Sequence, residues 1–71
     1  MPKKIRELKA ILKKAGFICL KDRGKGSHTV WEHPNVRNNV ILSGKDGKDA
    51  QRYQEKRVEE AIEEAKKNEQ S

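Results

Sequence analysis

The stretch Ala15-Gly16-Phe17-Ile18-Cys19-Leu20 decides how the chain folds, because it joins two patterns of different period. Upstream of it, residues 3–15 place apolar side chains at helical spacing among charged ones. Gly16 predicts the end of this helix, since glycine readily adopts the left-handed conformation that follows a helix. Residues 17–20 are too few and too rich in strand formers for another helix, so they predict a strand.

Downstream of this junction, turn residues alternate with short apolar segments. Residues 22–26 contain two glycines and predict a turn, and residues 27–33 predict a second strand. Another turn leads to a third strand at residues 40–42 and a loop at residues 44–48. Asp49 is expected to cap a second helix that ends near position 67. The apolar positions of this helix are Ala50, Tyr53, Val58, Ala61, Ile62 and Ala65.

The order of elements, helix, three strands and helix, predicts an α+β fold. Short turns between consecutive strands imply a three-stranded antiparallel sheet. Each helix has one apolar stripe, so we expect both helices to pack on one face of the sheet and leave the other face open. This is the architecture of double-stranded-RNA-binding domains. We expect a single domain over residues 1–71, with an ordered core at about 3–67.

Composition limits the functions that such a fold can support. A chain of 71 residues buries only about 60 % of the surface that its unfolded form exposes, so a deep cavity for a large cofactor is not expected. The formal net charge is +6, and residues 1–28 carry nine Lys or Arg against two acidic residues. A basic half indicates nucleic-acid binding; a solvated, lysine-rich helix face is the alternative explanation.

Signals for membranes or reactive thiols are not evident in the sequence. No apolar run approaches the roughly 20 residues of a membrane span, and the charged first residues lack the apolar segment of a signal peptide. We therefore expect no membrane association and a cytoplasmic location. Cys19, the single cysteine, lies among apolar neighbours, which is typical of a small core residue.

Few side chains in this chain offer covalent chemistry. His28 and His33 are the two histidines, and a regular strand would point them to opposite faces. No cysteine pair or carboxylate cluster completes a zinc site, so we expect neither metal nor cofactor. Ser27 and His28 are adjacent, and their side chains diverge in a strand instead of forming a serine triad.

A single histidine is sufficient for ribonuclease chemistry in principle. The 2′-hydroxyl of RNA is a built-in nucleophile, so an enzyme needs only to move protons and to bind the phosphate. Histidine suits this role because it exchanges protons near physiological pH. We expect His28 at the end of the sheet, partly exposed, although a regular strand would point it to the same face as Val30. The alternative is that His28 is an ordinary polar residue at a strand start.

The residues around His28 are suited to phosphate binding. Gly24 and Gly26 let the backbone approach a phosphate closely, and Arg23 and Lys25 can neutralise it. The full set of expected RNA-binding residues is Arg23, Gly24, Lys25, Gly26, Ser27, Lys45 and Lys48.

An ordered set of motifs resembles the HicA toxin family, also called YcfA-like. The motifs are Lys-Lys-Ala-Gly-Phe at 13–17, Lys-Gly-Ser-His at 25–28, and Trp31 followed by His33-Pro34. The resemblance implies a metal-independent messenger-RNA interferase in which the histidine of Gly-Ser-His, here His28, is catalytic. It also implies a HicB-type antitoxin that blocks the toxin, and translation arrest under stress that the antitoxin relieves. The chain would be a monomer alone or a hetero-oligomer with the antitoxin.

The chain departs from the family pattern at three places. Thr29 stands where many members have a second histidine, residues 42–48 replace a Pro-x-His-like segment, and residues 53–56 are unlike the commonest final helix. These differences indicate a subfamily and leave His28 in place.

Two other functions are compatible with the same fold. One is a non-catalytic RNA-binding module that uses Lys45, Lys48 and the first helix to contact phosphates. The other is a protein-interaction module that docks a partner on Trp31 and the open face of the sheet. Trp31 is more typical of a half-buried sheet residue than of a base-stacking platform.

Overall fold

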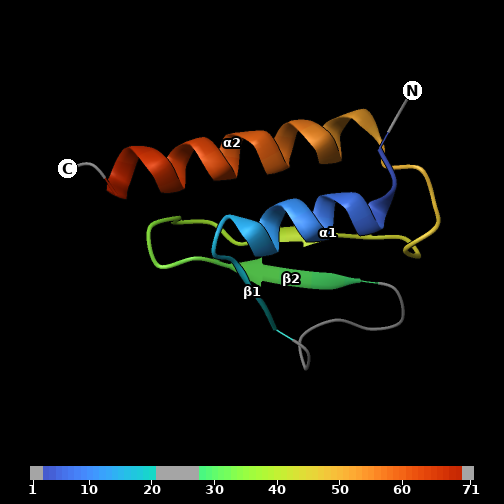
Figure 1. Ribbon diagram of the computed structural model, residues 1–71, viewed down its shortest axis with the longest axis horizontal. Helices are drawn as coiled ribbons and strands as arrows, with labels where there is room; N and C mark the ends of the chain where they lie inside the picture. The colour runs from blue at the N-terminus through green and yellow to red at the C-terminus, as the bar shows by residue number, and fades with distance from the viewer. Residues whose placement is uncertain (1–2, 21–27, 70–71) are drawn as a thin grey trace.

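The computed structural model describes residues 3–20 and 28–69. In this part of the chain the elements are α1 (Ile5–Lys14), β1 (Ile18–Leu20), β2 (Thr29–Glu32), β3 (Val40–Leu42) and α2 (Arg52–Glu69). The strands form one antiparallel sheet in the order β1-β2-β3. Both helices lie on the same side of this sheet and run side by side in the same direction (Figure 1). The predicted α-β-β-β-α architecture is therefore confirmed.

The junction between α1 and β1 has the geometry that Gly16 predicted. Gly16 adopts a φ of +96°. The Phe17 amide donates to the Leu12 carbonyl (3.0 Å) and the Gly16 amide donates to the Lys13 carbonyl (3.1 Å), which is the bond pair of a Schellman motif. A Cβ at Gly16 would also lie 3.3 Å from Nε2 of His33. Gly16 thus lets the chain turn, and because it lacks a Cβ it leaves room for the imidazole of His33.

The third strand matches its predicted bounds, whereas β1 and β2 are shorter than the sequence indicated. Phe17 lies just before β1, and His33 lies just after β2. The two rings contact each other, with centroids 4.9 Å apart, and Nδ1 of His33 accepts a hydrogen bond from the Asn35 amide (3.0 Å). Phe17 and His33 therefore act as packing and turn residues at the ends of their strands. The predicted start of the second strand at Ser27 lies outside the described residues.

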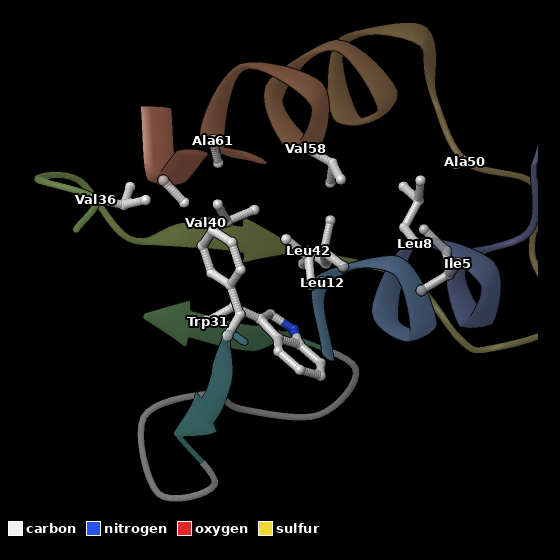
Figure 2. Close-up of a cluster of buried hydrophobic side chains, with 12 residues drawn as sticks. Ile5, Leu8, Leu12, Trp31, Val36, Val40, Leu42, Ala50, Val58 and Ala61 are labelled. Carbon is white, nitrogen blue, oxygen red and sulfur yellow. The ribbon is translucent and has the colours of Figure 1, made fainter. Parts of the chain in front are cut away.

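The core lies between the two helices and the inner face of the sheet (Figure 2). The strand register aligns Cys19 with Trp31 and Trp31 with Val40, so these three side chains share the inner face. Trp31 is only 5 % exposed, and its Nε1 donates to the Thr29 hydroxyl (3.0 Å). Cys19 is half-buried against the core, as expected. The remaining buried apolar residues are Ile5, Leu8, Leu12, Phe17, Val36, Leu42, Ala50, Val58, Ala61 and Ala65.

The outer face of the sheet carries a second set of apolar side chains. The register pairs Leu20 with Val30 and Val30 with Ile41, and Ile18 and Ile41 are each 59 % exposed. Trp31 points away from this face. The docking role considered for Trp31 on the open sheet is therefore wrong, because the indole fills the space beneath the helices.

Helix α2 begins later than the sequence indicated, at Arg52. Asp49 does not cap it: this residue pairs with Lys4 in an isolated β-bridge and binds the Lys4 ammonium through its carboxylate. Gln51 takes the capping position, and its amide donates to Oε1 of Gln54 (2.8 Å). The predicted Asp49 cap is wrong because a partner distant in sequence engages the carboxylate. No helix in residues 3–20 and 28–69 is long and apolar enough to span a membrane.

Candidate active site

His28 lies immediately before β2 and is exposed to solvent. It lines a pocket of about 280 Å³ at the point where the end of β3 and the start of α2 come together. The other residues around this pocket are Ser43, Gly44, Lys48, Asp49, Gln51, Tyr53 and Gln54. The position at one end of the sheet agrees with the expectation from the sequence, and a polynucleotide can reach an imidazole there.

The loop that carries Lys48 is held against the start of α1. The amides of Ile5 and Arg6, which have no partner within their own helix turn, donate to the carbonyls of Lys48 (2.9 Å) and Asp46 (3.1 Å). The Lys9 ammonium also binds the Asp46 carboxylate at 2.6 Å. The backbone on one side of the pocket is therefore fixed by the first turn of α1.

Gly44 lets this loop approach its neighbours closely. Its φ is +115°, a region that side chains with a Cβ rarely adopt. A Cβ there would lie 3.4 Å from the Ile5 side chain and 3.5 Å from Cδ of Lys48. The aliphatic part of Lys48 consequently lies close to Gly44, and Lys48 lines the same pocket as His28.

Gln54 forms the floor of the pocket and is the buried polar side chain of this region, with 3 % exposure. Its Nε2 donates to the Ser43 carbonyl (2.9 Å), and its Oε1 accepts from the Gln51 amide (2.8 Å). One side chain therefore joins the end of β3 to the start of α2. Because these are the two elements that converge near His28, Gln54 positions the pocket.

Replacing Gln54 with alanine is expected to lower the free energy of unfolding by about 1–3 kcal/mol, because the Ser43 carbonyl and the Gln51 amide lose their partners. Urea unfolding measures this change. Gln51→Ala is the matched control, since it removes an exposed glutamine side chain and keeps the backbone amide. Equal stability of the two variants would contradict the structural role of Gln54.

The charges around the pocket favour an anionic ligand. Lys48 lines it directly, and the Asp49 carboxylate is paired with the Lys4 ammonium. Together these three side chains carry a net positive charge. A pocket lined by a lysine and an exposed histidine is suited to a phosphodiester, because the cation can neutralise the phosphate while the imidazole moves a proton.

A family comparison relates this pocket to known proteins. A model of the HicA toxin of bacterial toxin–antitoxin systems matches residues 5–66. The chain belongs to the HicA toxin family. The resemblance inferred from the motifs is thereby confirmed, and the match includes His28 and all of the strands. No significant match was found among curated proteins or among solved structures.

The RNA-binding residues expected from the sequence are distributed unevenly in this HicA chain. Lys48 lies at the pocket with His28. Lys45 is exposed on the same loop but does not line the pocket, and its carbonyl accepts from the Lys48 amide (2.9 Å) to close the turn. The remaining expected residues, Arg23, Gly24, Lys25, Gly26 and Ser27, lie outside the described part of the chain.

Sequence reasoning did not identify the polar groups that frame the HicA pocket. No sequence motif includes Ser43, Gln51 or Gln54. The two glutamines are three residues apart, which is a spacing typical of a helix start. The second histidine is elsewhere: His33 follows the far end of β2. Within residues 3–20 and 28–69, no three His, Cys, Asp or Glu side chains are grouped to hold a metal ion.

Proposed function

We propose that this HicA chain is a metal-independent endoribonuclease that cuts messenger RNA at a phosphodiester presented to His28. The observation that supports the proposal most directly is that exposed His28 and Lys48 line the same pocket, in a chain that belongs to the HicA family. Both groups are needed for an RNA phosphodiester: one to transfer a proton, the other to neutralise charge.

The reaction that fits these groups is a transesterification within the RNA. The 2′-oxygen bonds to the adjacent phosphorus, and the bond from phosphorus to the 5′-oxygen of the next nucleotide breaks. His28 acts as general base or general acid for one of the two proton transfers, and water carries the other. Lys48 stabilises the charge on the phosphorus oxygens. The products carry a 2′,3′-cyclic phosphate and a 5′-hydroxyl.

The family assignment supports a partner as well as a substrate. HicA toxins pair with an antitoxin, and a HicB-type protein that covers the His28 pocket would block access of RNA. In the cytoplasm, release of the toxin would arrest translation by removing messenger RNA. The chain would act as a monomer and would be stored as a hetero-oligomer with its antitoxin.

Cleavage of a single-stranded RNA by the purified chain tests the function. We expect cutting to continue in excess chelator, and the 5′ fragments to end in a cyclic phosphate. The matched control is the same RNA with one 2′-deoxy nucleotide at the cut site, which should resist cleavage there because the nucleophile is missing. Loss of cutting on chelation, or equal cutting of the deoxy substrate, would contradict the mechanism.

A non-catalytic RNA-binding module is the second candidate function. It is favoured by the exposed position of Lys45 outside the pocket and by the exposed lysines Lys13 and Lys14 on α1. Such a module would bind RNA with an affinity that falls steeply with salt and would leave the RNA intact. Binding without any product in the cleavage assay would favour it over the ribonuclease.

A further inference from the structure

We propose that the groove beside the His28 pocket binds the nucleobase next to the cleaved phosphate, with Tyr53 as its stacking surface. This inference rests on the proposed ribonuclease function. It adds where the chain binds a base of the RNA substrate. The groove lies between Asn39 and the β3 residue Ile41 on one side and one face of α2 on the other, and it has a volume of about 450 Å³. Sites for small molecules span roughly 300–1,000 Å³, so a base with its sugar can be accommodated.

The groove and the His28 pocket are adjacent. Tyr53 and Gln54 line both of them, so the two hollows meet at the first turn of α2. A phosphate held at His28 would place the attached nucleoside at this meeting point. The aromatic ring of Tyr53 is therefore the surface that this nucleoside encounters first.

Tyr53 is an exposed aromatic residue that takes no part in the core. The helical pattern predicted an inward-facing residue, yet the side chain is 65 % exposed, and Gln54 takes the buried place next to it. That prediction is wrong because the polar contacts of Gln54 fix the rotation of the first turn. An exposed tyrosine beside a phosphate site is suited to base stacking, which contributes about 1–3 kcal/mol per base.

The remaining walls of the groove combine an apolar side chain with charged ones. Ile41 offers an exposed apolar side chain. The Arg57 guanidinium is engaged with backbone, since its Nη2 donates to the carbonyls of Asn38 (2.7 Å) and Asn39 (3.4 Å). Lys56 and Glu60 also line the groove and carry opposite charges. The exposed side chains of Ile41 and Tyr53 thus suit the groove to a base, while the phosphate lies at His28.

Binding of a single-stranded RNA with 2′-O-methyl groups tests this assignment, because it lacks the nucleophile and cannot be cut by the proposed mechanism. We expect Tyr53→Ala to weaken binding about 5- to 150-fold, the equivalent of 1–3 kcal/mol, and Tyr53→Phe to restore most of the loss. The probe should carry 5-iodouridine, and irradiation is expected to cross-link it to Tyr53.

Two isoleucines provide a matched pair for the groove. Ile41 and Ile18 are both 59 % exposed on the sheet, but Ile41 lines the groove and Ile18 belongs to β1 at the other edge. We expect Ile41→Ala to weaken RNA binding and Ile18→Ala to leave it unchanged. Thermal melting confirms that each variant is folded.

The outcomes separate this inference from the proposed function. If the chain does not cut RNA but Tyr53→Ala still weakens binding, the ribonuclease fails and the base site remains. If the chain cuts RNA and Tyr53→Ala binds and cuts as the wild type does, the base site is overturned. An effect of Tyr53→Ala on antitoxin affinity alone, with RNA binding unchanged, would also overturn it and assign the groove to protein binding.

Discussion

Replacing His28 with alanine is expected to reduce RNA cleavage by about 10²- to 10⁴-fold, the usual contribution of a positioned acid or base. The same change should shift the free energy of unfolding by no more than about 0.5 kcal/mol, because the side chain is exposed. Single-turnover cleavage of a short RNA and urea unfolding measure the two effects. Expression of the variant should also no longer arrest growth.

His33 is the natural control for this experiment, because it is the other histidine of the chain. Its ring packs against Phe17 and its Nδ1 accepts from the Asn35 amide. His33→Ala should therefore lower stability by about 1 kcal/mol, while its folded fraction cleaves RNA at the normal rate. The two histidines are thus expected to separate catalysis from stability.

Two results would contradict a catalytic role for His28. Undiminished cleavage by a carefully purified His28→Ala protein would show that another group moves the proton. A large fall in stability would show that the imidazole supports the fold instead. Loss of cleavage in His28→Ala alone would in turn exclude nuclease contamination, since a contaminant would cut RNA equally in both preparations.

The fold could be predicted from the sequence wherever the signal is local. Gly16 ends α1 through its own backbone conformation, and the short segments of β1 and β3 are apolar in themselves. The start of α2 could not be predicted in this way. Asp49 has the composition of a helix cap, but its carboxylate is engaged by Lys4, a residue 45 positions away.

The same distinction between local and distant signals applies to the candidate site. His28 could be named from its motif, because the Gly-Ser-His pattern is contiguous. The groups that shape the pocket could not, since Ser43 and Gln54 meet only when the end of β3 and the start of α2 come together. The exposure of Tyr53 could not be predicted either, because helical spacing gives the face of a residue only to within the rotation of the first turn.

The neighbouring residues Leu42 and Ile41 allow the packing of β3 to be tested within one strand. Leu42 is 1 % exposed and lies among the core side chains (Figure 2), whereas Ile41 points to the outer face. Leu42→Ala is expected to lower the free energy of unfolding by about 2–5 kcal/mol, through lost burial and the cavity that remains. Ile41→Ala should cost less than about 1 kcal/mol.

The size of the Leu42 effect matters because the domain is small. At about 0.05–0.15 kcal/mol per residue, 71 residues give a total stability of roughly 4–11 kcal/mol. Losing 2–5 kcal/mol would leave a substantial unfolded population at growth temperature, so the variant should lose toxicity although its His28 is intact. Cleavage should return at low temperature, where the chain is folded. If Leu42→Ala and Ile41→Ala unfold at the same urea concentration, the helices do not pack on the inner face of the sheet, and the pocket at His28 loses its structural basis.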